Sequence, residues 1–169
     1  MPMLSADALI RLLDLAPLPV EGGHFRETWR SEVTLAADAR DGRGRAAGTA
    51  IYYLLTDAPD DFSALHRLPT DEVYHFYLGD PVELVMLHPD GRAGTAVLGH
   101  DLAAGQRVQL VVPRGTWQGS RVAPGGRVAL LGTTMAPGFD PADYEGGIRA
   151  DLVARYPSAA PLIEALTRG

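Results

Sequence analysis

The sequence predicts an all-β domain, a sandwich or a barrel, with short helices at both ends. From residue 48 onward, short apolar segments recur too closely to alternate with helices, and turn-forming residues separate them. Apolar residues follow helical spacing only near the two termini. With 169 residues, 46% of them hydrophobic, the chain can bury a sizeable core. We therefore expect one domain over residues 1–169, with its β-core at about residues 48–135.

The N-terminal segment, residues 5–15, is expected to form a helix. Ser5 suits the N-cap position, and Asp7 lies where the helix dipole favours a negative charge. Two prolines, Pro17 and Pro19, would end the helix. Its apolar face would consist of Leu9, Leu12, Leu13 and Ala16.

The predicted strands follow in order along the chain. Residues 24–35 form an extended segment, and residues 38–45, rich in Gly, Arg and Asp, form a hairpin loop. Turns containing Pro, Gly and Asp then separate eight predicted strands, near residues 48–56, 62–68, 72–78, 82–87, 93–98, 107–112, 119–122 and 127–133. Short helices within residues 141–156 and 158–167 are expected to complete the chain.

Composition excludes several kinds of chemistry. The chain has no cysteine, which rules out disulfides, thiol nucleophiles and cysteine-ligated metals. All its basic residues are arginines, which rules out a Schiff-base lysine and a phosphate-loop lysine. The net charge of −6 argues against a nucleic-acid partner. Without a signal peptide or an apolar stretch of about 20 residues, we expect a cytoplasmic protein that does not bind membranes.

The stretch from residue 62 to residue 79 carries the strongest chemical signal. One predicted strand brings His66, and the next begins with Glu72. Because side chains alternate along a strand, one face of the second strand would carry Glu72, Tyr74, Phe76 and Leu78. The opposite face would carry Val73, His75 and Tyr77. A carboxylate on an otherwise apolar face is costly to bury, so we expect Glu72 to have a ligand or a raised pKa.

This stretch resembles the first sequence motif of the cupin superfamily. His66 matches the first histidine of a His-x-His pair, and Leu68 stands where the second histidine would be. Glu72 matches the glutamate of the motif, and Gly79 matches its closing glycine. The resemblance implies a double-stranded β-helix, the jelly-roll barrel of the cupins.

A second segment, residues 105–118, resembles the second cupin motif. Its Pro-x-Gly element is formed by Pro113 and Gly115, and Gln118 stands in place of the last histidine. More closely, the chain is similar to the cupin-5-like family of unknown function, which is related in shape to sugar-nucleotide 3,5-epimerases of the RmlC type. The segments that carry this likeness are residues 21–28, 50–55, 66–79, 112–118 and 136–140.

The ligand set distinguishes a metal centre from an organic pocket. Metal-binding cupins use three histidines and a glutamate, whereas here Leu68 cannot ligate and Gln118 offers only an amide oxygen. We therefore favour no metal cofactor. A divalent metal ion, if bound, would be held by His66, Glu72 and Gln118. His75 could join them only if its strand were bulged, because alternation places it opposite Glu72.

We expect instead that a small organic molecule binds inside the barrel: a sugar, a nucleotide sugar or a carboxylated metabolite. A pocket with apolar walls and a few converging polar groups is typical of such sites. The guanidinium of Arg26 could pair with a ligand carboxylate or phosphate. The other candidate binding residues are Tyr74, Phe76, Trp117 and Gln118.

Two enzymatic alternatives stay open. The first is a metal-independent epimerase or isomerase that removes a proton next to a carbonyl group, with His66 as general base and Tyr53 as general acid. Glu72 is a further catalytic candidate, and the sequence does not locate a carboxylate that would orient His66. The second is a metal-dependent dioxygenase or isomerase with a degenerate site.

A homodimer is the expected assembly, because the resemblance implies cupins that exchange N-terminal strands or pack sheet faces together. Residues 22–31 are the candidate for strand exchange. The face that carries Val73, His75 and Tyr77 is apolar enough to be covered, either by the chain's own helices or by a second subunit.

Overall fold

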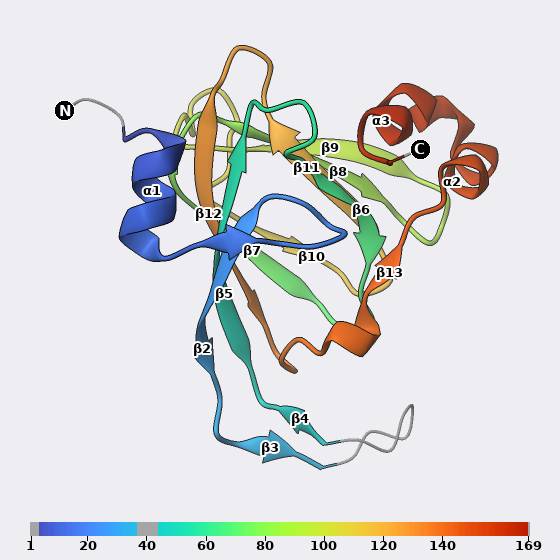
Figure 1. The fold of residues 1–169 in the computed structure, drawn as a ribbon. Coiled ribbons are helices and arrows are strands. Elements are labelled where there is room, and N and C mark those ends of the chain that lie inside the picture. Colours follow the sequence, from blue (N-terminus) through green and yellow to red (C-terminus); the bar gives the residue numbers. More distant parts are fainter. Residues whose placement is uncertain (1–3, 37–43, 169) are drawn as a thin grey trace.

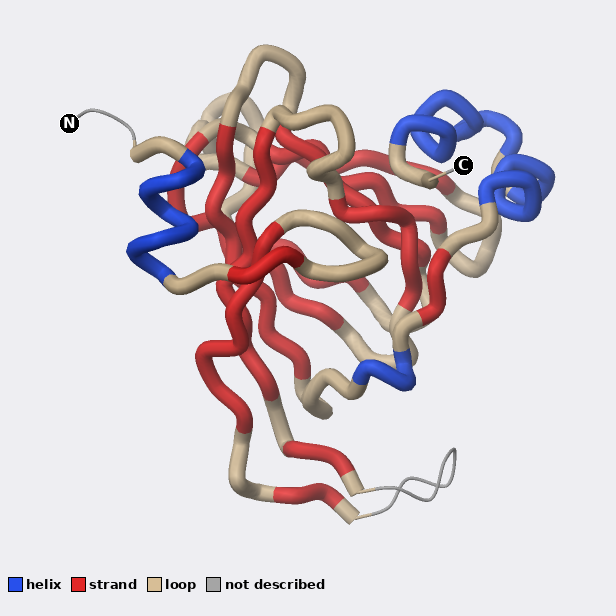
Figure 2. The backbone as a smooth tube through the Cα atoms, viewed as in Figure 1, coloured by secondary structure: helices blue, strands red, loops and turns tan. Residues whose placement is uncertain are grey.

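Two antiparallel sheets face each other in the computed structural model, which describes residues 4–36 and 44–168 (Figure 1, Figure 2). The larger sheet has six strands, in the order β1-β2-β5-β12-β7-β10. Their bounds are β1 (Ala16–Pro17), β2 (His24–Arg30), β5 (Thr49–Thr56), β12 (Val128–Met135), β7 (Glu72–Gly79) and β10 (Gln109–Val112).

The smaller sheet has five strands, in the order β13-β6-β11-β8-β9. Their bounds are β13 (Glu145–Gly146), β6 (Ser63–Arg67), β11 (Trp117–Val122), β8 (Val82–Leu87) and β9 (Ala93–Leu98). From β5 to β12 the chain passes repeatedly from one sheet to the other. This path confirms the predicted jelly-roll arrangement.

Helices pack on the outside of the two sheets (Figure 1). Helix α1 (Ala6–Leu13) begins after Ser5, whose hydroxyl accepts a hydrogen bond from the Ala8 N–H, and Leu9 and Leu13 pack on the larger sheet. Leu12 and Ala16, which were expected on the same apolar face, are exposed. The C-terminal region contains η1 (Pro141–Asp143), α2 (Arg149–Arg155), η2 (Pro157–Ala159) and α3 (Ala160–Ala165). Helices α2 and α3 share an apolar cluster with the smaller sheet. None of the helices described is long and apolar enough to cross a membrane.

The main core fills the space between the inner faces of the sheets. Its buried side chains are Tyr53, Leu55, Tyr74, Phe76, Val82, Leu84, Leu98, Leu110, Val112, Val122, Ala129 and Leu131. Burial alternates along the first five residues of β7, as predicted, with Glu72, Tyr74 and Phe76 buried. The outer face of β7 is the surface that we expected either the chain's own helices or a second subunit to cover, and the homodimer stays a prediction.

The end of β7 departs from this alternation. Phe76 and Leu78 pair with Leu131 and Leu130, two consecutive residues of β12, so Tyr77 is the extra residue of a bulge. A bulge reverses the direction of the side chains that follow it. Leu78 therefore packs outward in the α1 cluster, and the expectation that it shares the inner face is wrong.

A second bulge lies in β2. The register between β2 and β5 shifts between Glu27 and Trp29, which makes Thr28 the extra residue. Glu27 and Arg30 therefore lie on the same side of the strand. Beyond the bulge, the ribbon continues away from the sheets into β3 (Thr34–Leu35) and β4 (Arg45–Ala46) (Figure 1). Most of the loop predicted at residues 38–45 lies outside the described residues.

Candidate functional site

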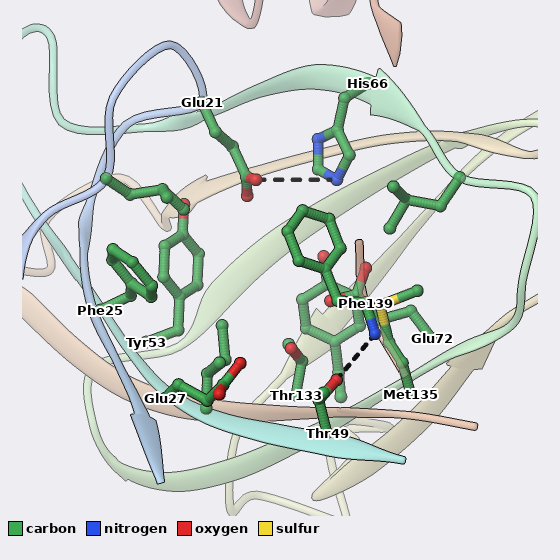
Figure 3. Close-up of a pocket in the computed structure, with 14 residues that line it drawn as sticks. Glu21, Phe25, Glu27, Thr49, Tyr53, His66, Glu72, Thr133, Met135 and Phe139 are labelled. Atoms are coloured by element: carbon green, nitrogen blue, oxygen red, sulfur yellow. Dashed lines mark hydrogen bonds and ion pairs between the residues drawn. The ribbon is translucent and has the colours of Figure 1, made fainter. Parts of the chain in front are cut away.

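A cavity lies between the sheets, bounded by the turn before β2 and by the segment after β12 (Figure 3). The cavity has a volume of about 80 Å³, which is room for several waters or a small organic group. Its lining combines aromatic, aliphatic and carboxylate side chains: Leu18, Glu21, Phe25, Glu27, Thr49, Ile51, Tyr53, His66, Leu68, Glu72, Tyr74, Thr133, Met135 and Phe139.

His66, on β6, is the nitrogen base of this cavity and is only 2% exposed. Its Nδ1 lies 2.8 Å from the carbonyl oxygen of Ala64. Because a carbonyl oxygen only accepts, Nδ1 carries a hydrogen, and Nε2 has a free lone pair when the ring is neutral. Tyr144 stacks on the imidazole, with ring centroids 5.2 Å apart, and helps to fix its orientation.

Glu21, in the turn before β2, faces His66 across the cavity (Figure 3). Its Oε2 lies 4.0 Å from Nε2 of His66, beyond hydrogen-bond length. Its Oε1 accepts a hydrogen bond from the Ser63 hydroxyl at 2.8 Å. Its carbonyl oxygen accepts from the Ala64 N–H and from the Arg168 guanidinium, each at 2.8 Å. These contacts hold both the turn and its carboxylate in place.

The turn that carries Glu21 depends on the glycine that follows it. Gly22 has a φ of +103°, and a Cβ at this position would lie 2.3 Å from the carbonyl oxygen of Phe62. A side chain is therefore excluded both by backbone conformation and by space. The Tyr53 hydroxyl donates a hydrogen bond to the Gly22 carbonyl at 2.9 Å, which ties the turn to the inner face of β5.

Glu72, at the start of β7, is a buried carboxylate on the opposite side of the cavity. Gln118 of β11 reaches it from the smaller sheet and donates a hydrogen bond from Nε2 to Oε2 at 2.7 Å. Burial raises the pKa of Glu72 above its ordinary value of 4.5. His66 opposes this increase, Glu21 adds to it, and hydrogen bonds from Thr133 and Gln118 oppose it. Burial has the largest effect, so Glu72 holds its proton more tightly than an exposed glutamate.

Two tyrosines, Tyr53 and Tyr74, form part of the inner wall. Burial is the main cause that raises the pKa of both hydroxyls well above 10, and nearby carboxylates add to the effect. The Tyr53 hydroxyl already donates to a backbone carbonyl. A general acid works best when its pKa is near the working pH, so Glu72 is better suited than Tyr53 to donate a proton.

Of the five predicted binding residues, only Tyr74 lines the cavity, and the other four lie outside its lining. Arg26 lies over the ring of Tyr52, 5.6 Å from its centroid, because alternation along β2 turns Phe25 and Glu27 toward the cavity instead. Phe76 belongs to the main core. Trp117 belongs to the cluster under α2 and α3. Gln118 contacts the site only through Glu72.

The bulge in β2 shapes the rim of the cavity. Arg30 donates to the carboxylate of Glu27 at 3.0 and 2.7 Å and to the carbonyl oxygen of Phe139 at 3.3 Å. The Phe139 N–H in turn donates to the Thr49 hydroxyl at 3.0 Å. These bonds place the Phe139 ring at the cavity and pair the rim carboxylate with a positive charge.

The residues present do not fit a cupin metal centre. Leu68 lines the cavity with a hydrocarbon side chain, and Gln118 turns an N–H donor toward Glu72. His75 lies on the outer face, where its Nε2 is 3.2 Å from the Thr134 hydroxyl. The bulge of β7 comes after His75 and does not bring it inward. Within residues 4–36 and 44–168, no three His, Asp or Glu side chains are placed to hold one metal ion.

Sequence reasoning did not single out Glu21, Phe25, Glu27, Phe139 or Tyr144 as site residues, although the first four belong to segments that carry the family likeness, residues 21–28 and 136–140. We expected a carboxylate to orient His66. In the structure, the backbone carbonyl of Ala64 orients the ring at Nδ1, and the carboxylate of Glu21 lies on the Nε2 side. One signal was available: two glycines directly follow Glu21 and mark a turn. Nothing local in the sequence links that turn to His66, which is 45 residues further along the chain.

Two facing antiparallel sheets connected in this order form the fold of a cupin. More specifically, the chain belongs to the Cupin_5 family, described as "Cupin superfamily (DUF985)", which it matches over residues 7–146.

A relative and several solved structures are similar to this chain. The yeast (Saccharomyces cerevisiae) "Uncharacterized protein YML079W" is 31% identical over 135 residues, which cover 73% of this chain and 66% of the yeast protein. A "Hypothetical protein from Leishmania major" matches with a TM-score of 0.87 and 32% identity, over 98% of this chain and 100% of that one. Protein SO0799 from Shewanella oneidensis matches with a TM-score of 0.85 and 37% identity, over 98% and 99% of the two chains. A dTDP sugar isomerase from Desulfovibrio desulfuricans G20, at 18% identity and a TM-score of 0.50 over 79% and 80% of the two chains, shares the fold alone.

The raised pKa of Glu72 predicts a pH-dependent stability. The folded protein binds this proton more tightly than the unfolded chain, so the stabilisation is present below about pH 4.5 and is lost as the pH rises through the folded-state pKa. As the pH rises from about 4.5 through the folded-state pKa of Glu72, we expect the free energy of unfolding of the wild type to fall relative to that of Glu72→Gln. Urea denaturation of both proteins at a series of pH values measures the difference. A difference that stays constant with pH contradicts the prediction.

Proposed function

We propose that this cupin binds a small sugar-like molecule in the cavity between its sheets, without a tightly held metal. The convergence of His66, Glu21 and Glu72 on one cavity with aromatic walls carries the proposal. Small-molecule sites typically combine such apolar walls with a few polar groups that orient the ligand. The residues that line this cavity provide both the apolar walls and the polar groups.

The two kinds of lining residue match the two kinds of surface on a sugar. Rings of Phe25, Tyr53 and Phe139 offer flat apolar faces to the C–H groups of a pyranose. Glu21, Glu72 and Nε2 of His66 are hydrogen-bond acceptors for hydroxyl groups. A sugar would therefore satisfy polar groups that are costly to leave buried without partners.

Among the three ligand classes that the sequence suggested, the charges favour the sugar. A carboxylated metabolite would place a negative charge near Glu21 and Glu72, which is unfavourable in a buried site. The predicted counter-charge, Arg26, lies on the other side of β2. A nucleotide sugar would have to keep its phosphates outside the rim, where Arg30 is already paired with Glu27.

The absence of a fitting ligand set leads to a prediction about metals. After incubation with Fe, Mn, Ni or Zn salts and desalting, the protein should retain well below about 0.1 metal ion per chain, because two good ligands do not hold a labile ion. Mass spectrometry of the untagged protein measures the content. One metal per chain, lost in both His66→Ala and Glu72→Ala, contradicts the proposal.

Sugar binding should depend on His66. We expect isothermal titration with a panel of hexoses to find a ligand whose affinity falls about tenfold or more in His66→Gln, because the variant replaces a ring acceptor held in place by stacking on Tyr144 with a flexible amide. His75→Gln is the matched control, since this histidine lies on the outer face, and it should bind like the wild type. Equal affinities of wild type and His66→Gln would contradict the proposed site.

A second candidate function is metal-independent isomerisation of a keto sugar. The observation that favours it is a base and an acid in one cavity: Nε2 of His66 with a free lone pair, and Glu72 with a raised pKa. His66 would take the proton from the carbon next to the carbonyl, and Glu72 would donate its proton to the carbonyl oxygen, which gives an enediol. Return of a proton to carbon and of the hydroxyl proton to Glu72 would complete the isomerisation.

Isomerisation predicts exchange of a carbon-bound proton with solvent. Keto sugars incubated with the protein in D₂O should lose the NMR signal of the hydrogen next to the carbonyl faster than without protein. The exchange should be abolished in His66→Gln and strongly reduced in Glu72→Gln, whereas Tyr53→Phe should retain most of it. Exchange in the Glu72→Gln variant at the wild-type rate would exclude Glu72 as the acid.

A further inference from the structure

A gap separates the carboxylate of Glu21 from the imidazole of His66. The neutral imidazole, with its hydrogen on Nδ1, presents Nε2 as an acceptor, and Oε2 of Glu21 is an acceptor as well. Nε2 has no hydrogen-bond partner among the described residues, although His66 is almost completely buried. With the imidazole in its neutral form, two acceptors face each other at 4.0 Å with no hydrogen between them.

One donor atom can bridge this gap. If it lies about 2.8 Å from each acceptor, the two hydrogen bonds leave it at an angle of about 90°, near the tetrahedral angle between two hydrogens. The donor must carry at least two hydrogens. A ligand hydroxyl has only one, whereas a water molecule, a primary amine or an ammonium group has enough. Of these donors, only the ammonium group also brings a positive charge.

The charges around the gap favour a positive donor. Glu27 is paired with Arg30 at the rim, but no ion pair to an arginine is formed by Glu21 or Glu72 in the described part of the chain. The guanidinium of Arg168, which lies near the turn, is occupied by backbone carbonyls of residues 20, 21, 60 and 62. When the imidazole is neutral, an ammonium ion between Glu21 and His66 would supply a positive charge beside both carboxylates.

We propose that Glu21 and His66 form a subsite for a primary ammonium group, so that the ligand of this cavity is an amine-bearing molecule of sugar size, such as an amino sugar. This inference rests on the proposed function, because it names the class of ligand that the cavity binds. The ammonium group donates one hydrogen bond to Oε2 of Glu21 and one to Nε2 of His66. The remaining ligand atoms pack against the aromatic walls.

The test compares probes that differ only in one group. D-glucose and its analogues with an amine at carbon 2, 3 or 6 are titrated into the protein in the presence of EDTA, and binding is followed by calorimetry. At least one amino analogue should bind about tenfold more tightly than glucose, because charge-assisted hydrogen bonds are stronger than neutral ones. Glu21→Gln should abolish this preference. Glu83→Gln, which neutralises an ion-paired carboxylate on β8, should retain it.

Each outcome has a distinct meaning. If glucose binds as tightly as all three amines, the ammonium subsite is wrong and the sugar-binding proposal stands. If the preference for an amine persists in Glu21→Gln, the amine binds elsewhere and the subsite is also wrong. If none of the four probes binds at concentrations up to about 50 mM, both proposals are overturned. The comparison of probes on the wild type decides the question even if Glu21→Gln does not fold.

Discussion

The cost of burying charge governs this interior. Two apolar sheet faces pack together and exclude water, yet Glu21, His66 and Glu72 extend into the same space. Each therefore needs a partner fixed by the fold: the Ser63 hydroxyl for Glu21, a backbone carbonyl for His66 and the Gln118 amide for Glu72. Two hydrogen-bond acceptors have no partner among these groups and face the cavity: Nε2 of His66 and one carboxylate oxygen of Glu21.

Segments distant in the sequence converge on His66 and fix its surroundings. The turn at Glu21 is held by Tyr53 of the larger sheet and by Arg168 near the C-terminus. On another side, Tyr144 stacks on the imidazole, and its neighbour Asp143 forms a buried ion pair with Arg45 of β4. The histidine thus contacts Tyr144 directly, and the Asp143–Arg45 ion pair connects that segment to the ribbon beyond β2. A preorganised site of this kind loses little conformational entropy when a ligand binds.

Patterns that depend on neighbouring residues were predictable from the sequence, and those that depend on distant residues were not. Alternation placed Glu72 and Tyr74 inward correctly, because it is a local property of a strand. It was wrong for Leu78, since a bulge is set by pairing with β12, more than 50 residues away. For the same reason the motif residues His66 and Glu72 were found, whereas Glu21 was not: its role follows from a turn that only the folded chain brings to His66.

Leu68 and Gln118 stand at two positions where metal-binding cupins have histidine ligands, and both make the interior less suited to a metal ion. Leucine at position 68 removes an imidazole and leaves hydrocarbon, and glutamine at position 118 supplies an N–H donor that a metal ligand would lack. That donor stabilises the ionised form of Glu72, a task that a cation performs in a metal centre. One neutral amide compensates only partly, because burial still raises the pKa of Glu72. The interior consequently keeps an excess of acceptors, and a ligand that donates hydrogen bonds or carries a positive charge is the natural complement to them.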